Sequence, residues 1–338
     1  MKYLIPNTFH LPVYAKAVVT IDSTEQLLAH YQTAQQQNWP FLVIGQGSNT
    51  LFTENFAGMV IINRIRGYTI EEHADAWRVT VGAGMIWHDL VKMTVEQAMP
   101  GLENLAMIPG CVGSAAIQNI GAYGVEFQKF ADYVDLLELS TGKLIRVTDG
   151  QYGYRDSVFK SQYLHGYVVV NVGIKLAKDW QPVLSYGELT QFDPVQVTAN
   201  MILEKVCAIR SAKLPDPQVL GNGGSFFKNP VIETAQAQAM LQNYPNMPYY
   251  PQANGQVKLA AGWLIDQCGL KGYQLGGAAV HDKQALVLVN KHQATSQDVI
   301  DLARLVRNHV QQKFAVVLSP EIRFIGALAE LDADQLLG

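Results

Sequence analysis

The stretch that decides the fold is IPGCVGSAAIQNIGAYG, residues 108–124. It carries no charged side chain, and its glycines would let the backbone approach a flat ligand closely. Gln118, Asn119 and Tyr123 add amide and phenol groups that can hydrogen bond. Neither helical nor strand periodicity fits, and a buried irregular loop, the alternative, would leave backbone polar groups without partners. We therefore predict a ligand loop with the apolar walls and few polar edges that an isoalloxazine ring needs.

The composition excludes two broad classes of protein. The chain has 338 residues, a formal net charge of −4, 28 glycines and only 16% charged residues, against about 25% in an ordinary soluble domain. Disordered chains and nucleic-acid-coating chains are far richer in charge. A chain of this length is expected to form two or three domains, each with its own core.

The cysteines, histidines and N-terminus point to a cytoplasmic protein. Cys111, Cys207 and Cys268 are far apart and form no CxxC pair, so neither a disulfide scaffold nor a zinc finger is indicated. The eight histidines form no HxxxH or HExxH motif, so we expect no metal. No apolar run approaches ~20 residues, and Pro6 interrupts the N-terminus before a signal-peptide core could form.

Short segments of both kinds alternate along the chain, which predicts an α+β fold. The N-terminal part gives a strand at 15–22, a helix starting at Ser23, and strands at 40–47 and 58–64. A hairpin and a helix over 86–99 precede the ligand loop. KLPDP, after a helix over 198–211, has two prolines and marks a domain boundary.

A second glycine-rich segment, Gly45-Gln46-Gly47-Ser48-Asn49, follows an apolar strand. Its backbone N–H groups could bind a pyrophosphate, although a plain glycine turn is equally compatible. It is not a Rossmann motif, because Thr50 replaces the third glycine and no helix pattern follows.

Ser225 follows the glycines of GNGGSFFKNP, residues 221–230, and with Lys228 it matches SxxK. The SDN and KTG motifs of the penicillin-binding acyltransferases are absent, so a structural serine in a turn is the commoner outcome. Arg155 in YRD, taken alone, indicates a structural ion pair. Glu321 and Arg323 are predicted on one face of a strand over 319–324, a face that is usually solvated unless it lines a cleft.

Seven motifs occur in order over nearly the whole chain: GQGSNTLF (45–52), IPGCVGSAAIQNIGAYG (108–124), GYRDSVFK (153–160), GNGGSFFKNP (221–230), KLAAGWLID (258–266), GGAAVH (276–281) and PEIRFIG (320–326). Together they resemble one family, the UDP-N-acetylenolpyruvoylglucosamine reductases of bacterial peptidoglycan synthesis. SYGEL (185–189) resembles the insertion of the family's longer type.

The resemblance implies a two-part FAD-binding unit of the vanillyl-alcohol-oxidase (PCMH) type plus a C-terminal α+β substrate-binding domain. The implied boundaries are 1–65 for the first FAD-binding subdomain, joined by 326–338, then 66–213 for the second subdomain and 214–325 for the substrate-binding domain. One departure is Ala116, where the family often has proline. We expect this residue to affect only the stiffness of a loop.

The resemblance also implies site residues, by motif match. The catalytic residues are Arg155, Ser225 and Glu321. The substrate contacts are Tyr186, which folds over the substrate, Lys213 and Asn229 at the UDP moiety, and Arg323. The FAD contacts are Gly45, Gln46, Gly47, Ser48, Asn49, Ile108, Pro109, Gly110, Gly113, Ser114, Gln118, Asn119, Gly121, Ala122, Tyr123 and Gly124.

The implied reaction reduces the enolpyruvyl ether of a UDP sugar to UDP-N-acetylmuramate. The implied cofactor is non-covalent FAD, with NADPH as co-substrate, and no nucleic acid, membrane or obligatory protein partner is expected. Hydride addition at the terminal methylene would place negative charge on the carboxylate, where Arg155 and a protonated Glu321 would stabilise it. Ser225 would deliver a proton to the adjacent carbon, with help from Lys228 or water left open.

Three other interpretations compete with this one. An FAD-dependent oxidase of the same superfamily would reduce oxygen instead of the enol ether. A non-catalytic flavin- or nucleotide-binding module would need only the two glycine-rich segments, and would need none of Arg155, Ser225 and Glu321. A serine acyltransferase is the most distant alternative.

Overall fold

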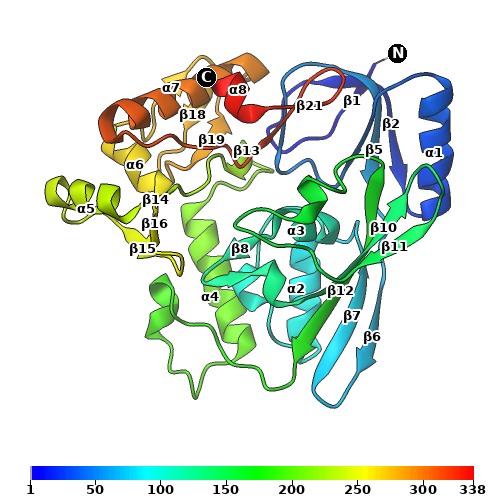
Figure 1. Cartoon of the computed structure of the whole chain (residues 1–338), viewed down its shortest axis with the longest axis horizontal. Helices are drawn as coiled ribbons and strands as arrows, with labels where there is room; N and C mark the ends of the chain where they lie inside the picture. The colour runs from blue at the N-terminus through cyan, green and yellow to red at the C-terminus, as the bar shows by residue number, and fades with distance from the viewer. Residues whose placement is uncertain (1) are drawn as a thin grey trace. The chain divides into compact units, whose positions relative to one another are not determined.

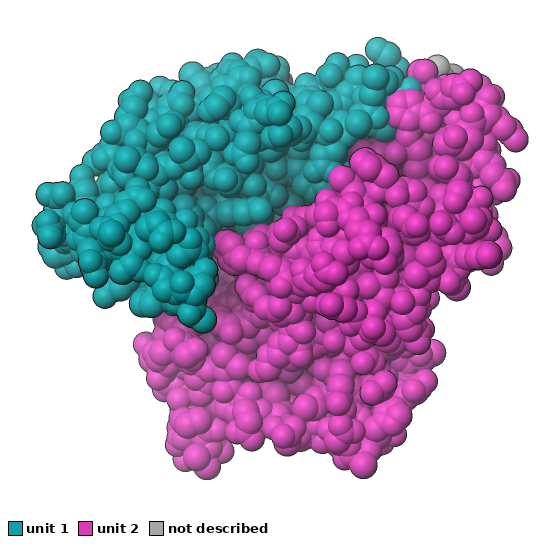
Figure 2. Space-filling view, viewed as in Figure 1, with its two compact units in different colours: residues 1–15, 47–57, 213–338 teal, residues 16–46, 58–212 magenta. Residues whose placement is uncertain are grey.

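The computed structural model describes residues 2–338, and its mixed helices and strands confirm the predicted α+β class (Figure 1). The chain forms two compact units, coloured separately in Figure 2. Unit 1 comprises residues 1–15, 47–57 and 213–338, and unit 2 comprises residues 16–46 and 58–212. The chain therefore changes unit four times, the last time at Lys213, two residues before the first proline of KLPDP. The finer subdomain boundaries stay a prediction.

Unit 2 is built mainly on a five-stranded sheet with the order β11-β10-β12-β7-β6, in which every pairing is antiparallel. A second sheet has the order β1-β2-β5-β3, in which β1 is Tyr3–Leu4 and β2 and β5 each begin in unit 1 and end in unit 2. The strands are β2 (Tyr14–Ile21), β3 (Phe41–Ile44), β5 (Phe56–Asn63), β6 (Tyr68–Glu72), β7 (Ala76–Gly82), β8 (Gly121–Ala122), β9 (Val125–Glu126), β10 (Ala131–Glu138), β11 (Leu144–Val147) and β12 (Tyr167–Ala177). The helices are α1 (Thr24–Gln36), α2 (Trp87–Glu96), α3 (Val112–Gln118) and α4 (Ala199–Lys213), with short 3₁₀ turns at Glu103–Leu105, Phe127–Lys129, Val158–Lys160 and Gly187–Gln191.

The larger hydrophobic core of unit 2 lies on one face of the five-stranded sheet, and a second buried cluster joins Leu137 and Val170 of this sheet to Leu27 of α1. Val79 and Val81 of β7 are buried, and they alternate with the more exposed Arg78 and Thr80 on the other face, as a half-buried strand requires. Helix α3 packs against β7 and β12 on the core side. Trp87 is fully buried, and its indole N–H donates to the carbonyl of Leu105 at 2.9 Å.

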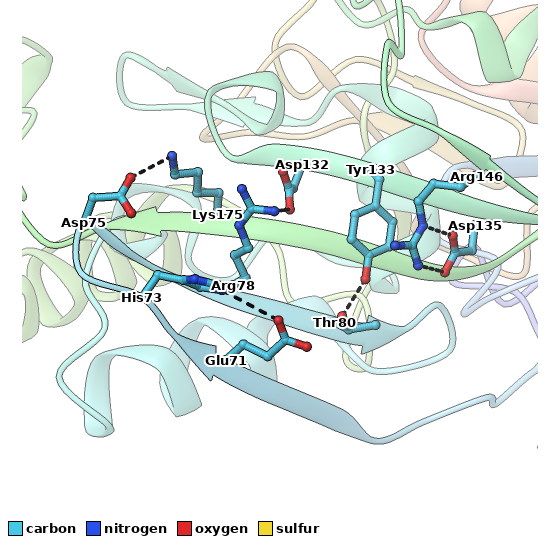
Figure 3. Close-up of polar contacts among 10 residues, drawn as sticks. All are labelled: Glu71, His73, Asp75, Arg78, Thr80, Asp132, Tyr133, Asp135, Arg146 and Lys175. Atoms are coloured by element: carbon cyan, nitrogen blue, oxygen red, sulfur yellow. Dashed lines mark hydrogen bonds and ion pairs between the residues drawn. The ribbon is translucent and has the colours of Figure 1, made fainter.

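The opposite face of this sheet carries a ladder of polar side chains (Figure 3). The ring of Tyr133 lies over Gly173 of the neighbouring strand, where an added Cβ would come within 2.3 Å of the ring. The Tyr133 hydroxyl hydrogen bonds with Thr80 at 2.5 Å, and the Arg146 guanidinium stacks 3.5 Å from the ring centroid while it pairs with Asp135 at 2.8 Å. The absence of a side chain at Gly173 thus makes room for a cross-strand aromatic clamp.

Unit 1 contains smaller sheets with the orders β13-β19-β18-β17, β14-β16-β15 and β21-β20-β4. Its strands are β1 (Tyr3–Leu4), β4 (Thr50–Phe52), β13 (Gly221–Ser225), β14 (Val231–Glu233), β15 (Tyr249–Pro251), β16 (Gln256–Leu259), β17 (Gln274–Leu275), β18 (Ala278–Val280), β19 (Val287–Asn290), β20 (Arg323–Ile325) and β21 (Glu330–Leu331). Its helices are α5 (Thr234–Asn243), α6 (Ala261–Gln267), α7 (Ser296–Phe314) and α8 (Ala333–Leu337). No helix within residues 2–338 is long and apolar enough to cross a membrane.

The pairing of β4 with β20 brings two distant parts of the chain together inside unit 1. The two strands are parallel, with Thr50 opposite Arg323 and Phe52 opposite Ile325. β20 lies between β4 and β21, and this places the PEIRF motif directly beside the end of the GQGSN motif.

Candidate active site

The first half of the GQGSN motif is attached to the 108–124 stretch within unit 2. The Gln46 side-chain oxygen accepts a hydrogen bond from Gly110 N–H at 2.8 Å, and the backbone N–H of Gln46 points to the Cys111 sulfur. Burial raises the pKa of the Cys111 thiol, although the nearby Arg64 and Arg66 charges oppose the rise. A Cβ at Gly45 would lie 2.9 Å from that sulfur, so only glycine allows this approach. The two glycine-rich segments predicted to bind the cofactor are therefore adjacent.

The 108–124 stretch contains a helix that its sequence pattern does not predict. Helix α3 spans only two turns, Val112–Gln118, and is set by its ends instead of by apolar periodicity. At the start, Cys111 N–H donates to the Ser114 hydroxyl, and Gly113 N–H donates to the carbonyl of Ala83. At the end, Asn119 adopts the left-handed conformation with φ of 42°.

Three residues of the 108–124 stretch, Ala116, Gly110 and Gly113, have surroundings that the sequence pattern does not predict. Ala116 is fully buried inside α3 and not in a loop, so the expectation about loop stiffness is wrong. The N–H groups of Gly110 and Gly113 donate to Gln46 and Ala83, and a Cβ at Gly113 would lie 2.8 Å from that of Ala83, so Gly113 allows close packing.

Asn119 connects the 108–124 stretch to the loop that carries Arg155. Its side-chain amide donates to the Gly153 carbonyl at 2.8 Å, and its side-chain oxygen accepts from Gln128 N–H at 2.9 Å. The residue is fully buried. The structure thus gives the Asn119 side chain protein partners, and its contact with the cofactor stays a prediction.

Arg155 is held in a strained backbone conformation in unit 2, with φ of 56°. Its guanidinium donates to the Gly121 carbonyl at 2.6 Å, and a Cβ at Gly121 would lie 2.7 Å from that guanidinium. The Lys160 ammonium donates to the Arg155 carbonyl at 2.8 Å. Lys160, the last residue of GYRDSVFK, thus supports the backbone of Arg155, a role that the sequence pattern did not indicate.

Ser225 and Glu321 come together inside unit 1, although 96 positions separate them in the numbering. Glu321 N–H donates to the carbonyl of Phe226, the residue after Ser225, at 2.8 Å, and Lys228 N–H donates to the carbonyl of Ser319 at 2.9 Å. Ser225 is presented by the left-handed Gly224, whose N–H donates to the buried side chain of Asn222 at 2.9 Å. Two of the three predicted catalytic residues therefore occupy neighbouring segments, while Arg155 belongs to the other unit.

The strand pattern around Glu321 follows the predicted alternation. Ile322 and Phe324 are buried, while Glu321 and Arg323 are less buried on the other side. The regular strand begins only at Arg323, later than the prediction.

The predicted substrate contacts lie in both units. In unit 2, Tyr186 is 46% exposed, and its ring meets the ring of Tyr123 edge-on at 5.9 Å. In unit 1, the Asn229 side-chain oxygen accepts from Ala261 N–H at the start of α6, so its NH₂ group is the part suited to a ligand. Arg323 forms a two-point ion pair with Glu330, with Nε to Oε1 at 2.8 Å. A substrate that uses Arg323 would have to compete with this pair.

The residues present fit a flavin dinucleotide on two counts. The side-chain oxygen of Gln118 is buried and has no hydrogen-bond partner among the described residues, and this leaves an acceptor for a ring N–H. The backbone N–H groups of Gly47 and Ser48 likewise donate to no acceptor within residues 2–338, as a pyrophosphate cradle requires. Gly47 has φ of 66°, and its Cβ would lie 2.7 Å from the carbonyl of Pro6.

The N-terminal side of the 108–124 stretch is held by two helices. Met107, with φ of 56°, donates its N–H to His88 Nδ1 of α2 at 3.2 Å, and its carbonyl accepts from Arg210 of α4 at 3.3 Å. Burial lowers the pKa of His88, and the Lys92 charge lowers it further. Desolvation also lowers the pKa of Arg210, and its Nε has no hydrogen-bond partner in the described part of the chain. The RSAKLP sequence gave no pattern that would have identified this arginine.

Comparisons with known proteins match both parts of the chain. Residues 216–325 match the model of the UDP-N-acetylenolpyruvoylglucosamine reductase C-terminal domain, and residues 15–148 match the model of an FAD binding domain. UDP-N-acetylenolpyruvoylglucosamine reductases of Salmonella typhi and Escherichia coli K12 are each 55% identical over 329 residues, which is 97% of this chain and 96% of theirs. The reductase of Yersinia pestis is 55% identical over the same share of this chain and 95% of its own.

A solved structure shows the same fold. The crystal structure of UDP-N-acetylenolpyruvylglucosamine reductase from Thermus caldophilus aligns with a TM-score of 0.65 at 23% identity. The alignment covers 96% of this chain and 98% of that one.

Proposed function

The chain belongs to the UDP-N-acetylenolpyruvoylglucosamine reductase family, and on this premise we propose that it reduces the enolpyruvyl ether of UDP-N-acetylenolpyruvoylglucosamine with NADPH, through non-covalent FAD. The product is UDP-N-acetylmuramate, a precursor of peptidoglycan. The observation that carries the proposal is the match over 216–325, because this segment contains both Ser225 and Glu321. The substrates are small molecules, and the reaction as proposed needs no protein partner.

Bound FAD supplies a hydride, which no amino-acid side chain can donate to a carbon–carbon double bond. The chain's own residues handle the charge and the proton. When the terminal methylene gains a hydride, negative charge collects on the carboxylate, where the Arg155 guanidinium is suited to a charge-assisted pair of hydrogen bonds. A preorganised group of this kind typically lowers a barrier by ~3–4 kcal/mol.

Ser225 and Glu321 have the remaining roles in the proposed reaction. Ser225 delivers a proton to the carbon adjacent to the carboxylate, as general acid, and this balances the hydride to give a saturated ether. Glu321 in its protonated form donates a hydrogen bond to the carboxylate. The bond from Glu321 N–H to Phe226 supports these roles, because it keeps the two residues in neighbouring segments.

The test is an anaerobic titration followed by visible absorbance. The purified holoprotein should show an oxidised flavin spectrum, NADPH should bleach it, and the UDP enolpyruvyl sugar should restore it with one equivalent of UDP-N-acetylmuramate formed. Denaturation should release the flavin into solution if it is bound without a covalent link. A bleached flavin that oxygen restores rapidly, and the sugar does not, would instead identify an FAD-dependent oxidase.

A further inference from the structure

We infer that Asn49 is a positioning residue for Glu321. The GQGSN motif then holds the segment that carries Glu321, in addition to its predicted contact with the cofactor. The inference rests on the proposed function, because it assigns Asn49 to the step that uses Glu321. Its basis is a pair of hydrogen bonds inside unit 1 between segments 272 positions apart.

Asn49 forms hydrogen bonds with the backbone on both sides of Ile322. Its side-chain Nδ2 donates to the Glu321 carbonyl at 3.1 Å, and its own backbone carbonyl accepts from Arg323 N–H at 3.0 Å. The parallel ladder between β4 and β20 begins one residue later, at Thr50 and Arg323. The Asn49 side chain therefore continues the pairing of the two segments beyond the first residue of β20, as far as the Glu321 carbonyl.

The opposite edge of Glu321 is fixed as well. Its N–H donates to the Phe226 carbonyl at 2.8 Å, beside Ser225. The peptide groups on both sides of the Glu321 Cα are thereby held, one by Phe226 and the other by Asn49. Holding both peptide groups fixes the point and direction from which the Glu321 side chain leaves the backbone, and misplacement of a reacting group by about 1 Å can cost a reaction up to ~10²-fold in rate.

Other contacts of the motif favour this assignment over a contact with the cofactor alone. Gln46 uses its amide oxygen on Gly110 in unit 2, and Asn49 uses its amide nitrogen on Glu321 in unit 1. The amide donor of Asn49 is thus engaged with protein, whereas the N–H groups of Gly47 and Ser48 meet no acceptor among the described residues. The backbone of the turn suits a phosphate, and its two amide side chains attach the turn to the rest of the site.

The decisive experiment is a double-mutant cycle on the FAD-saturated holoenzyme. We expect Asn49→Ala to slow reoxidation of the reduced flavin by the UDP enolpyruvyl sugar about tenfold, which is the effect of losing one hydrogen bond that matters only in this step. The rate at which NADPH reduces the flavin should stay within about twofold of wild type. In the Glu321→Gln background the same substitution should change reoxidation by less than about twofold. A purely structural defect would instead act equally in both backgrounds.

Two further variants keep the test decisive. Asn49→Asp preserves the shape but has no donor, so it should be at least as slow as Asn49→Ala, and it replaces that variant if the latter does not fold. Thr53→Val is the matched control. The Thr53 hydroxyl likewise donates to a backbone carbonyl, that of Ile325 in β20 at 3.2 Å, but it does not contact Glu321. This control should reoxidise at the wild-type rate.

Three results would overturn the inference: additive effects in the cycle, wild-type reoxidation in Asn49→Asp, or a change confined to FAD affinity. These differ from failure of the proposed function, in which the reduced wild-type protein would itself not react with the UDP sugar.

Discussion

At the scale of single residues, Ser225 has the most specific expected phenotype. Ser225→Ala removes the proton donor without touching the reaction with NADPH. The rate of flavin reduction by NADPH should stay within about twofold of wild type, while reoxidation by the UDP sugar should fall ~10²- to 10⁴-fold. Stopped-flow absorbance separates the two half-reactions. Equal loss in both would refute the general-acid role.

Arg155 allows its effects on stability and activity to be separated. Because φ is 56°, an L-residue at this position is strained, and glycine is not. Arg155→Gly should therefore have a free energy of unfolding about 1 kcal/mol larger than that of Arg155→Ala, as measured by urea unfolding. Both variants should lose reoxidation by the UDP sugar alike. If Arg155→Ala reoxidised at the wild-type rate, Arg155 would be a structural residue.

His88 predicts a pH dependence of stability. Its Nδ1 must be unprotonated to accept from Met107 N–H, and burial lowers its pKa below the ordinary histidine value of about 6.5. The unfolded chain therefore binds a proton at His88 more readily than the folded chain does. The stabilisation is fully present above pH 6.5 and is lost as the pH falls below it, through the unfolded pKa towards the folded one.

The measurement is urea unfolding at pH 8 and pH 5.5 for wild type and for His88→Asn, whose amide oxygen can still accept a hydrogen bond. The loss of unfolding free energy between the two pH values should be smaller in His88→Asn. An identical loss in both proteins would exclude His88 as the titrating group.

At the scale of elements, the clamp in Figure 3 makes a strand glycine essential. A methyl group at Gly173 would lie 2.3 Å from the Tyr133 ring, so Gly173→Ala must displace the ring from Thr80 and Arg146. We expect a loss of about 1–3 kcal/mol in urea unfolding. In a Tyr133→Ala background the same substitution should be neutral or stabilising, because alanine favours a strand more than glycine does. A full loss in that background would rule out the clamp as the cause.

The elements also show which parts of the fold could be predicted from sequence. Alternation correctly separated Ile322 and Phe324 from Glu321 and Arg323, since burial on a strand follows a two-residue period. Helix α3 could not be predicted in this way, because hydrogen bonds at its ends define it, and their partners include Ala83 and Met85 on another segment.

Some features of the candidate site could likewise be predicted from the sequence, and others could not. The family resemblance identified Ser225 and Glu321, and the structure brings them together. The amide bonds of Gln46, Asn49 and Asn119 join segments that are far apart in sequence, and a residue type alone does not reveal whether its amide meets protein or ligand. Their predicted roles as cofactor contacts therefore overlooked contacts that only the folded chain makes.

At the scale of the whole molecule, unit 1 is assembled from three separate segments, 1–15, 47–57 and 213–338. A fragment consisting of residues 213–338 would lack β4, the parallel partner of β20, and Phe9, whose ring lies 6.5 Å from that of Phe226. We expect this fragment to show poorly dispersed amide NMR signals and non-cooperative thermal unfolding. A fragment with a cooperative transition like that of the full chain would contradict this expectation.

The four changes of unit have a consequence for how such a chain can evolve. End-to-end fusion of two genes leaves one junction and a single insertion leaves two, whereas the four junctions after Ala15, Gln46, Ala57 and Ala212 mean that the two units alternate along the chain. Recombination between relatives is constrained in the same way. A crossover near residue 212 would bring in a new β20 and Glu321 but keep the original β4 and Asn49. The segments that contain β4 and β20 must therefore be inherited together or remain mutually compatible.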